Sequence, residues 1–222
     1  MKKLFLFVML ALAPLGAQAS AGAECGELGK CWVAPVNHQD KVSLQNGAKL
    51  YMNYCLGCHT LKYIRYDRMA NDLGIEPALV QEYLNFTSDK IGDQINNNVS
   101  AKDQAKWFGA PPPDLTLATR LRSANWVYSY LLNFYPDDKR PYGVNNKVFK
   151  DVAMPHVLDD LQRDLKPEEF RQAVGDITNF LAYTGEPNRA QSQRIGVWVL
   201  LFLSILLVPV WFLNREYWKD IK

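Results

Sequence analysis

Cys55-Leu56-Gly57-Cys58-His59 is the stretch from which the rest of the chain can be interpreted. Two cysteines separated by two residues and followed directly by a histidine form the attachment sequence of a c-type haem. At this spacing each thiol can form a thioether with one of the two vinyl groups on a porphyrin edge, while the imidazole binds the iron. The sequence therefore predicts one covalent haem c, held by Cys55 and Cys58, with His59 as an iron ligand.

Two other uses of this cysteine pair fit the sequence less well. A structural zinc site needs four ligands, whereas the other cysteines, Cys25 and Cys31, are widely spaced and the chain has only 3 histidines. A thioredoxin-like redox pair is expected within a βαβ unit, and we predict no strand around residue 55. In an oxidising compartment, Cys25 and Cys31 are instead suited to a small structural disulfide.

Residues 1–19 have the order of a secretory signal peptide. Lys2 and Lys3 form a charged start, residues 4–12 form a short apolar core, and Ala17-Gln18-Ala19 is an A-x-A cleavage site. The core is too short to span a bilayer, although an uncleaved anchor is the alternative. We therefore expect an exported protein, which agrees with haem attachment outside the cytoplasm.

A second apolar block, residues 195–213, contains no charged side chain. Its length suits one helix across a hydrocarbon layer of about 30 Å, and a buried helix of a soluble core would carry a broader polar stripe than Ser204 alone. Aromatic side chains near the two ends can anchor it at the interfaces: Trp198, Trp211, Tyr217 and Trp218. With an exported N-terminus, residues 214–222 form a cytoplasmic tail, and their cations agree with the positive-inside rule.

The expected exported domain, residues 20–194, is nearly neutral. Of 25 Lys and Arg residues, two lie in the signal peptide and three in the tail, and of 23 Asp and Glu residues two lie in the tail. The domain therefore carries about one net negative charge, which indicates no nucleic-acid partner and leaves any docking patch for a basic partner local.

Helices before and after the motif indicate the fold class. Apolar residues recur on one helical face from Leu44 to Cys55, with Ser43 as the expected N-cap. A last helix is expected from Pro167 to Gly185, because proline suits the first helical turn and glycine ends helices. This is the layout of a small c-type cytochrome. The sequence thus predicts a mainly α, class I c-type cytochrome-like haem domain followed by a single transmembrane helix.

The segments between these helices are mixed. We expect helices over 76–86 and 125–134, and loops over 88–106 and 135–147. The aromatic and basic segment 61–72 is interpreted as an ordinary amphipathic segment, with a haem-edge contact or a docking surface as the alternatives.

Ala110 to Leu115 contain three consecutive prolines, which fix an extended path. We call this stretch the proline rail. A ligating histidine needs a partner on its second ring nitrogen to fix its orientation. The proline rail can supply a backbone carbonyl to His59 for this purpose, although the sequence does not say which one.

The sixth iron ligand is expected to be Met154. A thioether suits an electron carrier because it favours ferrous iron and raises the reduction potential. The other methionines leave with the signal peptide, lie on the wrong helical face, or need a tight return of the chain: Met1, Met9, Met52 and Met69. His156 is the competing ligand, and His38 is a more distant one. Arg120 and Arg122 are candidates to pair with the haem propionates, with a plain surface position as the alternative.

On these residues the sequence resembles the cytochrome c1 family, the haem subunits of bacterial cytochrome bc1 complexes. The resemblance covers nearly the whole mature chain. Besides the haem motif, it depends on four stretches: 110–115, 153–155, 176–187 and 215–219. The last two are the more specific, because generic c-type cytochromes lack them.

The resemblance implies single-electron transfer by one haem c, with Met154 as the sixth ligand. It also implies an arginine near the propionates; Arg122 matches that position best, and a shorter connection leaves Arg120 possible. The implied partners are cytochrome b, the Rieske iron–sulfur subunit as donor and a cytochrome c as acceptor, with the haem domain on the periplasmic side of a bacterial inner membrane. The chain would then be the electron-transfer subunit of a quinol–cytochrome c reductase, with no quinol site of its own. Family members often carry strongly acidic docking patches, whereas this domain is nearly neutral, so docking to a basic cytochrome c is a less secure expectation than electron transfer itself.

Three alternatives stay open at this point. The first is a free-standing membrane-anchored cytochrome that carries electrons to an oxidase. The second is a haem enzyme such as a peroxidase, which needs an open sixth position. The third is a thiol–disulfide protein without haem.

Overall fold

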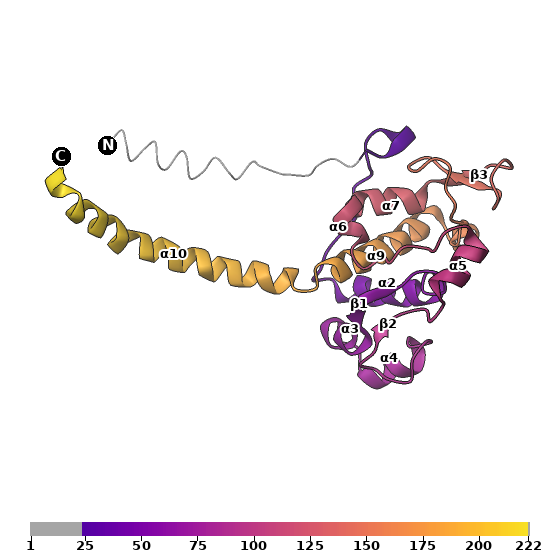
Figure 1. Cartoon of the computed structure of the whole chain (residues 1–222), viewed down its shortest axis with the longest axis horizontal. Helices are drawn as coiled ribbons and strands as arrows, with labels where there is room; N and C mark the ends of the chain where they lie inside the picture. Colours follow the sequence, from indigo (N-terminus) through magenta and orange to yellow (C-terminus); the bar gives the residue numbers. More distant parts are fainter. Residues whose placement is uncertain (1–23, 222) are drawn as a thin grey trace.

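Two long helices lie side by side at the centre of the domain, α2 (Lys41–Tyr54) and α9 (Pro167–Gly185). Helix α7 (Ala124–Leu132) packs on α9, and helix α3 (Tyr66–Leu73) contacts α2, so that the helices form successive layers (Figure 1). Helix α9 has the bounds that its proline and glycine predict. The haem motif directly follows α2, so this central pair fixes where the motif lies.

The structure is a computed structural model that describes residues 24–221, and the expected signal peptide at 1–19 lies outside them. It is mainly helical, as predicted, with two small antiparallel sheets, β1–β2 and β3–β4. The remaining elements are short, apart from α10: η2 (Gly26–Leu28), β1 (Leu61–Arg65), α4 (Pro77–Tyr83), β2 (Gln94–Ile95), α5 (Ala101–Phe108), α6 (Ala118–Arg122), β3 (Phe134–Pro136), β4 (Val144–Asn146), α8 (Asp159–Asp164), α10 (Arg189–Tyr217) and η3 (Lys219–Ile221).

The contact between α2 and α9 is unusually close and contains a buried carboxylate. A Cβ atom added to Gly47 would lie 2.0 Å from the backbone oxygen of Asp176, so only glycine lets the helices approach this closely. The Asp176 side chain is 4% exposed and accepts hydrogen bonds from Ser43 Oγ (2.7 Å), Asn46 Nδ2 (2.6 Å) and Gln172 Nε2 (2.9 Å). A buried carboxylate needs such donors, and here those from Ser43 and Asn46 join α2 to α9.

The predicted N-cap of α2 is wrong by three residues. Asp40 is the cap, and its carboxylate accepts a hydrogen bond from the backbone N–H of Ser43 (3.1 Å). The Ser43 hydroxyl donates to Asp176 instead. Both residues are good cap formers, and only the packing of α9 decides that Ser43 faces the interior.

Two stretches predicted as loops contain regular structure. Ser100 caps α5 through its hydroxyl, which accepts from Asp103 N–H, so the loop expected over 88–106 is wrong at its end. In the loop expected over 135–147, β3 and β4 pair with Tyr135 opposite Asn145. Strand β1, which we did not expect, pairs with β2. These strands are too short to show a periodic pattern, and pairing across the chain stabilises them.

The N-terminal segment is attached to the domain next to the end of β4. A disulfide joins Cys25 to Cys31, as the sequence analysis expected. The backbone N–H of Glu27 donates to the carbonyl of Lys147 (2.8 Å). Gly26 has φ +51°, and a Cβ there would lie 2.6 Å from the same carbonyl, so glycine permits this contact.

Helix α10 extends away from the domain (Figure 1). Its stretch from Gln191 to Tyr217 is long and apolar enough to cross a membrane, and it is the only such helix among the described residues. The side chains of this stretch are exposed, unlike those of a soluble core helix. The helix is longer than the expected span 195–213 because it begins in the polar turn at Arg189 and continues to Tyr217.

Candidate haem site

The haem motif lies in a tight turn that ends α2. Cys55 caps the helix, with its N–H donating to the carbonyl of Tyr51 (2.9 Å). The N–H groups of Cys58 and His59 then both donate to the carbonyl of Cys55, at 3.1 and 2.8 Å. This turn brings the two thiols and the imidazole to one side of the chain.

Cys55 and Cys58 are both free thiols. Burial raises the pKa of the Cys55 thiol to about 12, and burial also raises the pKa of Cys58. Redox-active cysteine pairs have lowered pKa values, because the thiolate is the reactive form. The site is therefore unlike that of a thiol–disulfide protein.

One cavity of about 190 Å³ adjoins the motif, and its lining is largely apolar. Three segments that are far apart in the sequence meet there: the motif, the proline rail and the loop that carries Met154. The lining residues are Tyr54, Cys55, Cys58, His59, Phe108, Ala110, Pro111, Pro112, Pro113, Ala153, Met154, Pro155 and Val157. An apolar pocket with a few placed polar groups is what a haem site requires.

The proline rail orients His59. The ring Nδ1 of His59 lies 2.7 Å from the carbonyl oxygen of Pro113, which assigns the proton to Nδ1 and leaves Nε2 with its lone pair. Burial lowers the pKa of His59, against the opposing effect of this bond, and so favours the neutral imidazole that a metal needs. Sequence analysis predicted a carbonyl from the rail, and Pro113 supplies it.

Asp114 in turn fixes the rail to the motif. Its carboxylate accepts from Thr60 Oγ1 (2.7 Å), from the backbone N–H of Lys62 (2.9 Å) and from that of Thr116 (3.1 Å). Burial opposes ionisation, but these donors prevail and hold the pKa of Asp114 below its usual range. Sequence analysis missed this role, although a Pro-Asp pair is a turn signal.

Met154 lines the same cavity as His59, whereas neither competing ligand, His156 or His38, lines it. His156 Nε2 lies 2.7 Å from Gln162 Oε1, and its ring stacks on Phe134 with 4.7 Å between centroids. His38 lines a separate cavity of about 630 Å³. The remaining two described methionines, Met52 and Met69, are buried in the core.

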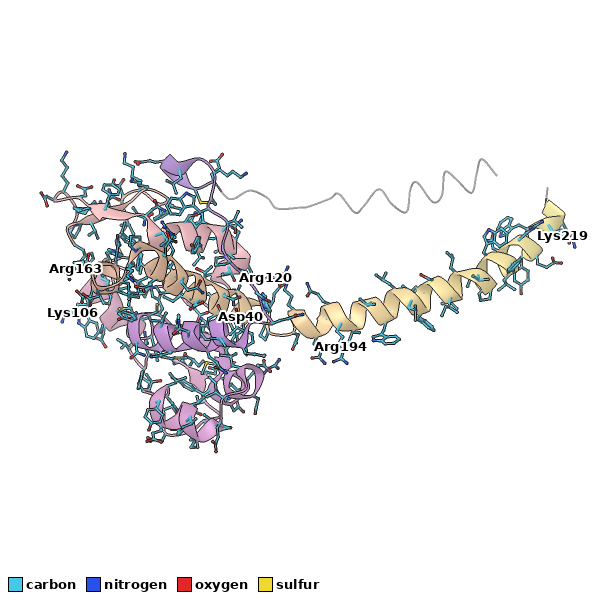
Figure 2. All side chains as sticks on the ribbon, turned by 180° about the vertical axis from the view of Figure 1, so that it is seen from behind. Asp40, Lys106, Arg120, Arg163, Arg194 and Lys219 are labelled. Carbon is cyan, nitrogen blue, oxygen red and sulfur yellow. A yellow bond between two sulfur atoms is a disulfide. The ribbon has the colours of Figure 1, made fainter. Side chains whose placement is uncertain are left out.

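The two candidate arginines lie in different surroundings. Arg122 is 5.3 Å from the ring centroid of Trp126, which stacks on Tyr130, whose hydroxyl contacts Met154. Arg120 pairs with Glu186 and lines the cavity that contains His38. In Figure 2, Arg120 lies at the end of the domain from which α10 extends. The structure therefore associates Arg122, and not Arg120, with the Met154 side of the cavity.

Two side chains from other elements complete the site, and no sequence pattern points to either of them. Gln104 of α5 donates from Nε2 to the carbonyl of Cys58 (3.1 Å). Tyr130 of α7 donates from its hydroxyl to Sδ of Met154 (3.5 Å). Burial raises the pKa of Tyr130, so this hydroxyl stays a neutral donor. A buried glutamine and a partly buried tyrosine are ordinary in any fold, so only their contacts identify them.

The residues around the cavity fit a c-type haem by their chemistry. Two uncombined thiols, an oriented neutral imidazole and a thioether line one largely apolar space. Together with the single long apolar helix, the fold and the site define a membrane-anchored c-type cytochrome.

Comparison with known proteins identifies the family within this class. Residues 32–221 match the Cytochrome C1 family. Cytochrome c1 of Allochromatium vinosum is 46% identical over 100% of both chains. A protein of Nitrosomonas europaea called ammonia monooxygenase gamma subunit is 38% identical over 98% of this chain and 97% of its own. Cytochrome b/c1 of Bradyrhizobium diazoefficiens is 29% identical over 85% of this chain and 35% of its own. The chain belongs to the cytochrome c1 family, whose members are the haem subunits of cytochrome bc1 complexes.

Proposed function

We propose that this chain passes single electrons from the Rieske iron–sulfur subunit to a cytochrome c, through one haem c attached to Cys55 and Cys58. His59 and Met154 are the proposed iron ligands. The observation that carries the proposal is that both thiols, the imidazole and the thioether line one cavity. When bound, the haem supplies a one-electron ferric–ferrous couple.

The chain's own residues orient the ligands and exclude water. The Pro113 carbonyl holds the proton of His59 on Nδ1, so Nε2 is the donor toward the iron. Asp114 keeps the proline rail at the distance from the motif that this bond requires. The apolar lining from Phe108, Pro111 and Val157 would lower the dielectric constant around a bound haem. The dielectric constant around a metal centre is one determinant of its reduction potential.

Arg122 is the proposed partner of the haem propionates, with Arg120 in a structural role. Arg122 is exposed and lies over Trp126, so its guanidinium is available to an anion beside the cavity. Arg120 is already paired with Glu186, which also pairs with Arg189 at the start of α10. A propionate would have to compete with this carboxylate for Arg120.

We further propose the membrane arrangement that the sequence predicts. A signal peptide at 1–19 exports the haem domain (20–194) to the periplasm, helix 195–213 crosses the inner membrane, and 214–222 remain in the cytoplasm. Helix α10 would then lie beside cytochrome b. The three cations of the tail support this orientation.

The alternatives are weakened by particular observations. A peroxidase needs an open sixth position, whereas Met154 lines the same cavity as His59 and offers a second ligand atom. A thiol–disulfide function is opposed by the raised pKa values of Cys55 and Cys58. A free-standing anchored cytochrome shares every feature of the site, so only its assembly distinguishes it.

The first test is purification of the native protein from membranes in mild detergent, with a haem-stained denaturing gel and an optical spectrum. We expect a haem-staining band of this chain accompanied by b-type haem and an iron–sulfur subunit. A haem-staining band alone would indicate a free-standing carrier. Copurification with monooxygenase polypeptides would indicate an assembly like that named for the Nitrosomonas relative. Absence of haem stain would contradict the interpretation of Cys55 to His59.

A further inference from the structure

Tyr130 has a hydroxyl group that the proposed mechanism does not use. This hydroxyl donates a hydrogen bond to Sδ of Met154, which is its hydrogen-bond partner among the described residues. A buried hydroxyl without a partner would be destabilising, and a thioether sulfur is a weak acceptor. The Tyr130 hydroxyl therefore contacts the Met154 sulfur, which is the atom proposed to bind the iron.

The position of this hydroxyl is fixed by groups other than Met154. The Tyr130 ring stacks on Trp126 (5.1 Å between centroids, 8° between planes) and meets Phe134 edge-on (5.2 Å, 71°). Asn146 Nδ2 donates to the Tyr130 carbonyl (2.8 Å). The Tyr130 hydroxyl is therefore positioned by residues of α7 and β4. The Met154 sulfur forms the hydrogen bond only when it lies beside this fixed hydroxyl.

The same aromatic stack continues in both directions. Arg122 lies over Trp126, and His156 stacks on Phe134. Arg122, Trp126, Tyr130 and Phe134 therefore form a continuous row in which each side chain contacts the next. His156 is two residues from Met154, so the stack also positions the loop that carries the thioether.

We propose that Tyr130 is a positioning residue that holds the Met154 sulfur and raises the reduction potential of the haem. This inference rests on the proposed function, in which Met154 is the sixth ligand. A hydrogen bond to sulfur withdraws electron density from its lone pairs, and the sulfur then donates less to ferric iron. The ferrous state is consequently favoured. Hydrogen bonds to ligand atoms are an established means of tuning a metal centre.

The test compares Tyr130→Phe with Tyr128→Phe in the full chain, purified as the native complex. Both changes remove one phenol oxygen from α7, but Tyr128 faces α9, where its ring lies near Gly175. The measurements are the midpoint potential, the thioether-to-iron absorption band of the ferric protein and carbon monoxide binding by the ferrous protein. Tyr130→Phe should shift the ferric–ferrous equilibrium about threefold toward ferric, which is ~28 mV for one electron, and Tyr128→Phe should not.

Each outcome distinguishes this inference from the function on which it rests. A lowered potential with the band retained, or partial loss of the band with carbon monoxide binding, in Tyr130→Phe alone supports it. An unchanged potential and band in Tyr130→Phe overturns it and leaves the ligand assignment intact. Met154→Leu is the separate control for the assignment: if that variant keeps the band and excludes carbon monoxide, Met154 is not the ligand and both ideas fail. Because phenylalanine preserves the stack, Tyr130→Phe should keep its haem and fold.

Discussion

His59 is held by two restraints of different origin. The backbone turn at Cys55 fixes its main chain, and the Pro113 carbonyl fixes its ring. The first is local, so the motif predicts it. The second joins residues 54 positions apart, and it depends on Asp114 keeping the proline rail against Thr60 and Lys62.

At this scale we expect Met154→Leu to keep the covalent haem and lose the thioether ligand. Leucine has similar volume and no donor atom, so ferrous iron should bind carbon monoxide. The potential should fall by at least ~59 mV, a tenfold change in the equilibrium constant. Spectroscopy with redox titration checks this, with Met52→Leu in the core as the control. A variant that still excludes carbon monoxide would point to another sixth ligand.

Asp114→Ala should release the proline rail. The change leaves three donors without their acceptor, and we expect a loss of roughly 1–3 kcal/mol in the free energy of unfolding, measured by urea denaturation. Glu82→Ala, on the exposed surface of α4, is the control and should be within about 0.5 kcal/mol of the parent.

The stabilisation by Asp114 should also depend on pH in a defined direction. Its pKa is lower in the folded than in the unfolded chain. The stabilisation is therefore fully present above the unfolded pKa of about 3.9 and is lost as the pH falls through the folded pKa. The difference in stability between the parent and Asp114→Ala should be constant near neutral pH and shrink below about pH 4. A difference that grows on acidification would contradict this.

At the scale of elements, the contact between α2 and α9 determines the shape of the domain. The buried carboxylate of Asp176 receives three side-chain donors across or beside this contact. The sequence predicts both helices, since their apolar faces and end signals are local. It does not predict their crossing point, because Gly47 and Asp176 are ordinary residues until the helices meet.

Gly47→Ala should destabilise the domain although alanine is the better helix former. The new methyl group would lie 2.0 Å from a backbone oxygen of α9, which cannot move aside as a side chain can. Overpacking of this kind costs about 1–3 kcal/mol or more, against a gain of less than 1 kcal/mol from helix propensity. Thermal unfolding of the purified protein checks this. Gly92→Ala, which meets no atom within 4 Å, is the control; equal melting temperatures would show that the helices can separate slightly.

The short elements explain why the remaining fold was mispredicted. Helix α5 and the β3–β4 pair lie in polar stretches whose composition is typical of loops. Asn146 in β4 shows the reason: it is buried and its side chain donates to the Tyr130 carbonyl and accepts from Val148 N–H. Such asparagine side chains form hydrogen bonds with backbone groups of neighbouring residues and segments. No periodicity in the sequence predicts these bonds.

At the scale of the whole molecule, the domain and the anchor are nearly independent. The apolar stretch of α10 is exposed along its length and packs on nothing in the described chain. The junction contains mainly surface ion pairs, from Glu186 to Arg120 and Arg189. Surface pairs contribute little to stability, so the haem domain should not need the helix to fold.

A chain ending after Asn188, with the proposed signal peptide at 1–19 kept, should therefore be recovered as a soluble protein with its haem. We expect the haem content, the thioether band and the midpoint potential to match those of the full chain. Asn188 is retained because it accepts a hydrogen bond from Arg68 (2.7 Å). Fractionation into soluble and membrane material, with haem staining, is the measurement. If the truncated domain lacks haem or a thioether band, α10 contributes to the site.

The sequence by itself determined the features whose causes are local. These are the haem motif, the apolar block of the anchor, the bounds of α9 and the stiffness of the proline rail, because spacing, hydrophobicity and proline geometry act within a few residues. Tertiary structure alone decided that Pro113 faces His59, that Arg120 lines the cavity with His38 whereas Arg122 lies over Trp126, and that Tyr130 contacts Met154. These contacts join segments many residues apart, and their geometry follows from how α2, α7 and α9 pack, which no single segment encodes.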